Sequence, residues 1–414
     1  MGARGDALKT RRARPIAALA SRGTRRTPLE VEPVTDAERQ AARWARSDAG
    51  PPLLTIDGHL DLAMNALLWN RDITLEVDTL RTIERTAGEV GPGRGRNTVT
   101  IPELRRAGIG VSLATVLART GGAPTPALPR YASAEIAYGM AQGQLAYYRI
   151  LERQGQVRLV RTRAMLEGHW EAWRSWHASG APAGDEPPHG VVLLMEGADS
   201  IPSPDYLASW FDDGLRVLGM THYMDSTYAH GTGTEGGLKP PARELLAAMA
   251  ELGMVLDVTH LADQSFWEAL DLWQGPILAS HQNARALVPG ERQFDDAQLR
   301  AIIERGGVVG ASIDAWMLHP GWVRGQTRPD VVGLGAVVDQ LAHVCQLAGN
   351  SRHVAIGSDL DGGFGTEQTP VDLDTIADLQ KLPGLLRQRG FGDDDVRAVM
   401  HGNWLRFLSA ALPA

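Results

Sequence analysis

Several features that would indicate other classes of protein are scarce or absent in this 414-residue sequence. Cys345 is the only cysteine, so an intrachain disulfide and a cysteine-rich zinc site are both excluded. No run of 18 apolar residues occurs, and no membrane-spanning helix is therefore expected. The apolar run at 16–20 is shorter than the roughly 7–15 residues of a signal-peptide core. With no signal peptide or membrane segment recognised, we predict a cytoplasmic protein.

The sequence also has no excess of basic charge. The formal net charge is 41 − 49 = −8, which argues against broad binding to nucleic acid or to an anionic membrane surface. Basic residues are nevertheless concentrated at the N-terminus, where residues 1–26 carry eight Lys or Arg against one acid. We predict a disordered basic leader over residues 1–35 and a single domain over residues 36–414.

What the sequence does contain is an alternation of short apolar runs with amphipathic helical stretches. The helical pattern is clear over 132–154, 241–252 and 295–305, and a glycine suited to a helix C-terminus follows each of the last two. The apolar runs number eight: 53–57, 109–116, 191–196, 217–222, 254–260, 276–281, 307–313 and 353–359. Strands buried on both faces read as such continuous runs, and eight βα units predict an α/β fold of the (β/α)₈ TIM-barrel type. A doubly wound sheet is the alternative, but no Gly-x-Gly-x-x-Gly follows the first run.

Acidic and imidazole side chains stand at the ends of six of these eight runs. They are His59 and Asp61 after the first run, then Glu196, His222, His260, His281 and Asp359 at the third, fourth, fifth, sixth and eighth. In a parallel barrel the strand ends form one rim, the C-terminal face, where active sites are found. Imidazoles and carboxylates are the ligands that Zn²⁺ takes when no thiolate is present. The pattern therefore predicts a metal site at this face.

The charges of these groups favour two metal ions rather than one. Two divalent ions bring +4, and Asp61, Glu196, Asp359 and a bridging hydroxide bring −4, so the buried charge is compensated. Other roles remain open for single residues. Glu196 could instead cap or pair with the turn that follows it, His222 could be a hydrogen-bonded loop residue, and Asp361 could exchange roles with Asp359.

Two further aspartates, within or beside the predicted strands, are candidates for orienting the ligand-type histidines. Asp57 and Asp257 precede ligand-type histidines by two and three residues, and we expect them to orient those histidines. Cys345 falls in a helical pattern of apolar residues and is expected in the core.

Taken in order, the motifs resemble those of the membrane (renal) dipeptidase family over residues 53–408. They are Asp57-Gly-His-Leu-Asp61, Met195-Glu-Gly197, Met220-Thr-His222, Leu256-Asp-Val-Thr-His260, Ala279-Ser-His281, Ile356-Gly-Ser-Asp-Leu-Asp-Gly362 and Gly402-Asn-Trp-Leu-Arg406. The resemblance implies an amidohydrolase-type barrel with a binuclear zinc site. It also implies hydrolysis of the amide bond of a small dipeptide-like substrate by a hydroxide that bridges the two Zn²⁺ ions. A homodimer is a candidate assembly that the sequence itself does not decide.

The resemblance assigns roles to individual residues. His59 and Asp61 correspond to ligands of the first metal, His260 and His281 to ligands of the second, and Glu196 to the carboxylate that bridges them. His222 corresponds to the histidine that polarises the substrate carbonyl, and Asp359 to the acid/base aspartate. Arg292 corresponds to the arginine that binds a substrate carboxylate. Other amidohydrolases bridge their metals with a carboxylated lysine. The three lysines of this chain, Lys9, Lys239 and Lys381, lie at no strand end, which leaves the bridge to Glu196.

The sequence departs from the family pattern where the substrate would be held. Leu60 stands where the family has Asn, and the run at 307–313 leads into Asp314 without the usual aromatic cluster and its tyrosine. Arg292 could also be a solvated loop residue. Three other functions stay open: hydrolysis of another small amide or N-acyl substrate, a metal-binding barrel without turnover, and a metal-free barrel isomerase that binds phosphate.

Overall fold

The computed structural model describes residues 51–125, 128–182 and 184–414. Within them eight parallel strands follow one another around a barrel in the order β7-β6-β5-β4-β2-β1-β9-β8. A parallel bridge between Ala279 and Val309 joins the two ends of this order, so the barrel closes. The strands are Thr55–Leu60 (β1), Ile109–Val116 (β2), His189–Met195 (β4), Leu215–Gly219 (β5), Val255–Asp257 (β6), Ile277–Leu278 (β7), Val309–Ala311 (β8) and Val354–Ile356 (β9). All eight overlap the predicted apolar runs, and the predicted barrel is confirmed.

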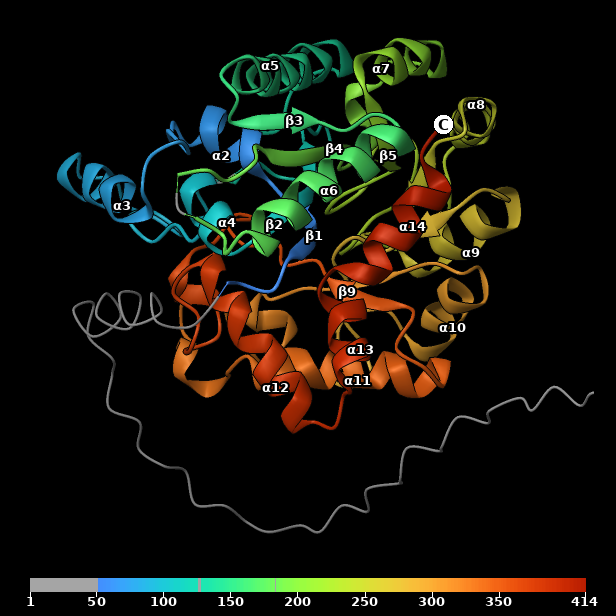
Figure 1. Ribbon diagram of the computed structural model, residues 1–414. Coiled ribbons are helices and arrows are strands. Elements are labelled where there is room, and N and C mark those ends of the chain that lie inside the picture. The colour runs from blue at the N-terminus through green and yellow to red at the C-terminus, as the bar shows by residue number, and fades with distance from the viewer. Residues whose placement is uncertain (1–50, 126–127, 183) are drawn as a thin grey trace, which may run out of the picture.

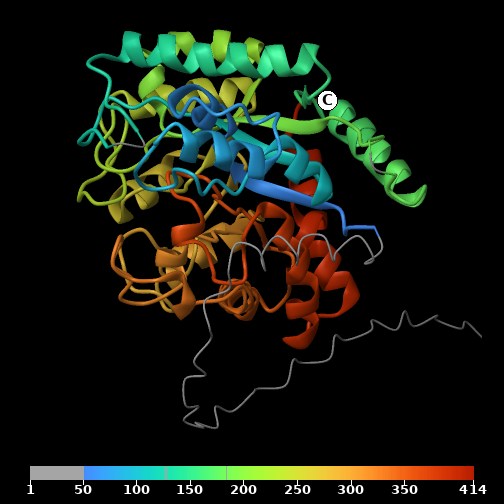
Figure 2. The ribbon, with the colours of Figure 1, turned by 90° about the vertical axis from the view of Figure 1, so that its left-hand side faces the viewer.

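Helices surround the strands on the outside (Figure 1). The predicted helical stretches appear as α5, α8 and α10, and Gly253 ends α8 in the left-handed conformation, at φ 66°. The helices are Leu62–Leu68 (α2), Val77–Thr86 (α3), Ile101–Arg106 (α4), Ala134–Arg153 (α5), Arg163–Ala178 (α6), Leu207–Asp213 (α7), Ala242–Leu252 (α8), Asp263–Leu272 (α9), Asp296–Glu304 (α10), Gly335–Ala348 (α11), Leu382–Gln388 (α12), Asp393–Arg397 (α13) and Asn403–Ala411 (α14). Figure 2 shows α5 lying along one side of the barrel and the C-terminal helices on the opposite side.

One strand was not predicted from the sequence. β3 (Val157–Leu159) pairs in parallel with the first half of β4, outside the ring of eight. It has only three residues and an exposed arginine at its centre, so it shows no continuous apolar run. It therefore carries none of the signal that identified the other strands.

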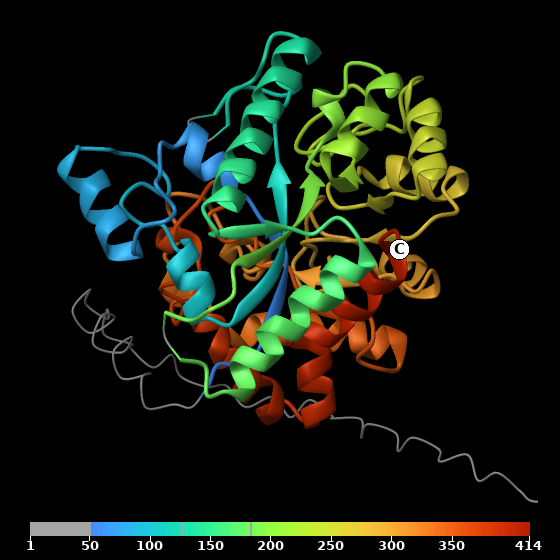
Figure 3. The ribbon, with the colours of Figure 1, turned by 45° about the horizontal axis from the view of Figure 1, so that its top comes forward.

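The inside of the barrel is filled by side chains, and two helices cover the end at which the strands begin. α6 and α14 lie side by side there (Figures 1 and 3). Trp173 of α6 donates to the Pro188 carbonyl next to the start of β4, and Trp404 of α14 donates to the Ile356 carbonyl. A Cβ at Gly58 would lie 2.5 Å from the Trp404 ring, so β1 needs glycine at this contact. The residues that follow the strand ends lie at the opposite face.

Cys345 is buried in α11, as expected. The predicted leader over 1–35 lies outside the described residues. Among the helices of the described part of the chain, none combines the length and the apolar character needed to cross a membrane.

Candidate metal centre

The strand ends bring the predicted metal ligands, His222 and Asp359 together at one face of the barrel. His59 lies in β1, and the others follow the ends of β1, β4, β5, β6, β7 and β9 within four residues. Six of the seven side chains are buried, and that of Asp359 is 15% exposed. The group consists of His59, Asp61, Glu196, His222, His260, His281 and Asp359.

The Glu196 carboxylate lies at the centre of this group. Four imidazole Nε2 atoms surround its Oε1, at 3.2 Å (His260), 3.5 Å (His281), 3.6 Å (His59) and 3.8 Å (His222). The carboxylate does not cap the turn that follows, because the N-cap of that turn is Gly197 and no side chain bonds to it. Glu196 thus stands between histidines from four strand ends, the position that a bridging ligand requires.

Three overlapping sets of donor atoms are close enough to hold metal ions. In each set the ligand atoms all lie within 4.8 Å of one another. The sets are His59, His281 and Asp359; Glu196, His222 and His260; and His59, Asp61 and Glu196. All donors are nitrogen or carboxylate oxygen, the chemistry expected for a zinc site without thiolate. The sets overlap through His59 and Glu196, which each belong to two of them.

The electrostatics of the centre favour a positive charge beside His59. Burial lowers the pKa of His59, but the carboxylates of Glu196, Asp61 and Asp359 outweigh it and raise that pKa to about 10. The His59 Nε2 atom is buried and has no hydrogen-bond partner among the described residues. The same carboxylates would favour a metal cation at this nitrogen, where the metal-free protein holds a proton.

The other histidines are kept neutral, which is the form of imidazole that binds metal. The pKa of His260 and of His281 lies well below the usual value, first because of burial and then because of Arg292 and a neighbouring histidine. Burial would raise the pKa of Glu196, but His222 and His59 hold it well below its usual value. A neutral nitrogen donor set around an ionised carboxylate is ready to accept a cation.

Hydroxyl groups hold the histidine rings in place from behind. The Ser280 Oγ lies 2.9 Å from His281 Nδ1 and 3.3 Å from His59 Nδ1, and the Thr232 Oγ1 lies 3.0 Å from His260 Nδ1. Contacts of this kind orient ligand rings and tune their affinity for metal. The sequence analysis missed both hydroxyls; Ser280 directly precedes a ligand-type histidine, and this adjacency was the available signal.

Asp57 and Asp257 orient the site differently from the expectation. Asp57 Oδ1 accepts hydrogen bonds from the backbone N–H groups of His59 (3.1 Å) and Ser358 (2.8 Å). Asp257 Oδ1 accepts from the backbone N–H groups of Thr259 (3.0 Å) and Ser280 (3.1 Å). Neither carboxylate bonds to an imidazole ring. Each instead ties the backbones of two neighbouring strand ends together, because its position in the strand directs it along the sheet rather than toward the rim.

The structure separates the roles of Asp359 and Asp361. Asp359 lines the cavity, with Oδ1 4.0 Å from His59 Nε2. Asp361 turns away and accepts hydrogen bonds from the N–H and hydroxyl of Thr98 and from the N–H of Val99. Both aspartates adopt positive φ, 58° and 62°, so the chain turns sharply between them. Asp361 therefore secures this turn, and only Asp359 faces the cluster.

Arg292 is buried rather than solvated. Its guanidinium donates to the Gln282 side chain (2.7 Å) and to the backbone carbonyl of His281 (2.8 Å). Its Nε has no partner among the described residues. Two of its N–H groups are thus used within the protein, and the unpartnered Nε is itself buried.

A cavity of about 340 Å³ opens over the metal-ligand cluster. Of the predicted residues, Asp61, Glu196, His222, His260, His281 and Asp359 line it, whereas His59 and Arg292 do not. Arg119, Tyr223, Asp314 and Arg324, which were not predicted, also line it. Asp314 directly follows the seventh apolar run, 307–313, and its carboxylate oxygens accept from the Gln368 side-chain amide. Burial is the main influence on the pKa of Asp314 and raises it to about 6. The strand-end criterion would have found Asp314 had the run been followed one residue further.

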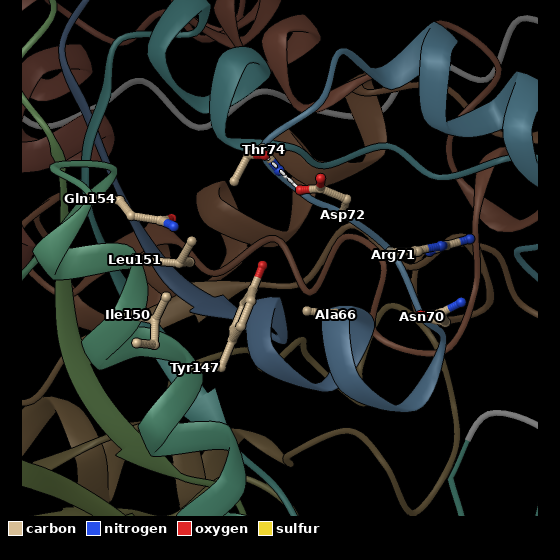
Figure 4. A pocket seen from close by; sticks show the side chains of 9 residues that line it. All are labelled: Ala66, Asn70, Arg71, Asp72, Thr74, Tyr147, Ile150, Leu151 and Gln154. Atoms are coloured by element: carbon tan, nitrogen blue, oxygen red, sulfur yellow. Dashed lines mark hydrogen bonds between the residues drawn. The ribbon is translucent and has the colours of Figure 1, made fainter.

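A second surface pocket, of about 410 Å³, lies between α2 and α5 but offers no comparable cluster (Figure 4). Arg71 points away from Tyr147 in this view and bonds to Glu84, Asn65 and the Gly93 carbonyl. The other side chains shown do not converge on one point. The cavity over Glu196 is therefore the candidate active site.

The barrel with this set of acidic and imidazole residues belongs to a known class of metallopeptidases. The family model of membrane dipeptidase (Peptidase family M19) matches residues 52–412, and the chain therefore belongs to this family. Dipeptidase aclJ of Aspergillus oryzae is 31% identical over 225 residues, which are 52% of this chain and 50% of that protein. An uncharacterized dipeptidase of Schizosaccharomyces pombe is 27% identical over 220 residues, 52% of this chain and 51% of that protein.

These alignments span about half the length of both curated relatives. A solved structure is matched more completely. It is the metallo peptidase from Rhodobacter sphaeroides, whose crystal structure contains a phosphinate mimic of the dipeptide L-Ala-D-Ala. The two structures align with a TM-score of 0.69 and 25% sequence identity, over 87% of this chain and 99% of that one. The whole barrel, rather than a fragment of it, is thus shared with this structure.

Proposed function

We propose that this chain is a zinc-dependent dipeptidase that hydrolyses the amide bond of a dipeptide. The observation that carries the proposal is the contact of one carboxylate oxygen, Glu196 Oε1, with the Nε2 atoms of four histidines. Membership of the membrane dipeptidase family and the likeness to a structure that binds a dipeptide mimic support the same reaction.

Two Zn²⁺ ions are the cofactor that the residues fit best. His59 and Asp61 would hold one ion and His260 and His281 the other, with Glu196 shared between them. Such a pair of ions lowers the pKa of a water molecule and polarises the scissile carbonyl. His222, whose Nε2 also lies near Glu196, would donate a hydrogen bond to that carbonyl as charge develops on its oxygen.

The protein side chains would carry the protons and hold the substrate. The pKa of Asp359 is raised well above its usual value by burial, despite the nearby His59, so this carboxylate exchanges protons closer to neutral pH. It would take the proton released by the attacking water and deliver it to the leaving amine. Arg292, whose guanidinium lies beside β7, would bind the C-terminal carboxylate of the substrate.

The test is metal analysis of the purified chain combined with a panel of dipeptides and one N-acetyl amino acid. We expect about two zinc ions per chain and turnover of dipeptides that metal chelation abolishes and Zn²⁺ restores. Glu196→Ala should lose both metal and activity, whereas Glu304→Ala, an exposed carboxylate on α10, should lose neither. A fully metal-loaded protein that leaves every dipeptide intact would contradict the proposal.

A further inference from the structure

The cavity contains a buried arginine that none of the proposed catalytic steps uses. Arg119 lies three residues after β2, lines the cavity and is 7% exposed. Its Nη2 donates to the carbonyl oxygens of Ala123 and Leu128 in its own loop. Its Nε is buried and without a partner among the described residues. Of the guanidinium nitrogens, Nη1 has no hydrogen bond within the described residues and is left for a ligand at the cavity wall.

The positive charge of Arg119 has no paired carboxylate in the described part of the chain. Two other buried arginines do have such partners: Arg71 pairs with Glu84 at 2.8 Å, and Arg81 pairs with Asp374 at 3.0 Å. Arg216 and Arg292 are buried too and bond to carbonyl or amide oxygens instead. Burial is the main influence on the pKa of Arg119 and lowers it. Carboxylates act on this arginine only from beyond ion-pair distance. Because a buried charge is costly unless it is compensated, an unpaired guanidinium at a cavity wall marks a place for an anionic ligand.

Arg119 and Arg292 lie on opposite sides of the barrel mouth. β2 is four strands away from β7 in either direction around the ring of eight. Arg119 follows β2, and Arg292 bonds to the His281 carbonyl just after β7. The pKa of His222 is lowered to about 4, chiefly by burial, and both arginines contribute to this lowering. Arg119 thus lies at the cavity wall beyond β2, and Arg292, which does not line the cavity, lies behind His281 on the side of β7.

This placement determines which part of a dipeptide would reach Arg119. If Arg292 binds the C-terminal carboxylate, as proposed above, the scissile carbonyl lies over Glu196 and the N-terminal residue extends toward β2. We propose that Arg119 is a specificity-determining residue that binds an acidic side chain on the N-terminal residue of the substrate, so that the chain prefers glutamyl or aspartyl dipeptides. This inference rests on the proposed dipeptidase function.

The test compares dipeptides of the same shape that differ in charge. Glutamyl-alanine and glutaminyl-alanine differ only in the side-chain carboxylate, so the ratio of their kcat/KM values isolates its contribution. For the zinc-loaded full chain we expect a ratio of at least about 10, which corresponds to about 1.4 kcal/mol. The measurement needs no variant, and a ratio near 1 would overturn the inference.

Variants then assign the preference to Arg119. Arg119→Met should bring the ratio to about 1 by lowering kcat/KM for glutamyl-alanine, and Arg119→Lys should retain part of it because a charge without the planar fork remains. Arg130→Met is the matched control: this exposed arginine of the same loop donates to the Thr120 carbonyl and does not line the cavity. It should leave the ratio unchanged.

The outcomes separate this inference from the proposed function. If glutaminyl-alanine and alanyl-alanine are cleaved but the preference for glutamyl-alanine persists in Arg119→Met, only the role of Arg119 is wrong. If the zinc-loaded chain cleaves none of the three dipeptides, the dipeptidase function itself fails. Metal content and melting temperature, measured for each variant, show whether a lost preference comes from a disrupted fold.

Discussion

Metal binding to this chain is expected to release at least one proton near pH 7. The pKa of His59 in the metal-free protein is raised to about 10 by three carboxylates, so its ring is protonated at neutral pH. A protonated imidazole cannot bind a metal, and the proton must leave. Three pH units between pH 7 and this pKa correspond to a cost of about 4 kcal/mol, which the metal has to supply.

The proton can be counted by titration calorimetry. Zn²⁺ is added to the metal-free chain at pH 7 in buffers with different enthalpies of protonation, and the slope of the observed heat against these enthalpies gives the protons released. The apparent association constant should also rise by about tenfold per pH unit between pH 6 and pH 8, once the competition of hydroxide and buffer for zinc is corrected. The sign follows from the raised pKa, because protonation opposes metal binding at every pH below about 10.

Glu196→Gln provides the matched perturbation. It removes the strongest of the carboxylate influences on His59 while keeping the shape of the side chain, so fewer protons should be released, with a weaker affinity. Glu304→Gln, on the exposed face of α10, should behave as the unchanged chain. Zinc binding that releases no proton at pH 7 would refute this account of the site.

Three further predictions concern single side chains. Asp359→Asn should keep its zinc and lose turnover by about 10²–10⁴-fold, because it removes the proton carrier; undiminished kcat would show that another group performs this step. Arg292→Ala should raise KM for dipeptides with a free C-terminal carboxylate and leave the KM of C-terminally amidated analogues unchanged; equal effects on both would argue against the carboxylate contact. Ser280→Ala should weaken zinc affinity by about 10–100-fold without loss of the fold, measured by competition with a chelator and by melting temperature, whereas unaltered affinity would mean that the hydroxyl does not support the ligands.

The sequence was most informative about the strands and the rim. Each barrel strand is buried on both faces, so it appears as an apolar run, and the residue that ends a run must point toward the same face as its neighbours. This physical link is why Glu196, His260 and His281 could be placed together before the structure was known. β3 could not be predicted because it has only three residues and pairs beside β4, so it contains no continuous apolar run.

The direction of side chains beyond the strand ends could not be predicted in the same way. Asp359 and Asp361 are two residues apart and chemically identical, and only the two positive φ angles decide that one faces the cavity and the other faces Thr98. The same holds for Arg119, whose position depends on a loop closed by its own hydrogen bonds to Ala123 and Leu128. Periodicity carries no information about such turns.

If His59 and His281 are ligands of different ions, as proposed, their shared contact with Ser280 would couple the two metal positions. If His59 and His281 both bind metal through Nε2, each neutral ring carries its hydrogen on Nδ1, and both donate to the lone pairs of the single Ser280 oxygen. The serine proton is then directed to Thr259 Oγ1, 3.4 Å away. One hydroxyl thus fixes the tautomer of both rings. A first ion that fixes the Nδ1–H tautomer of one histidine would orient the Ser280 hydroxyl, and this would favour the same tautomer of the other histidine before the second ion binds. Loading of the two positions should accordingly be cooperative in this protein, through an oxygen atom that touches neither metal.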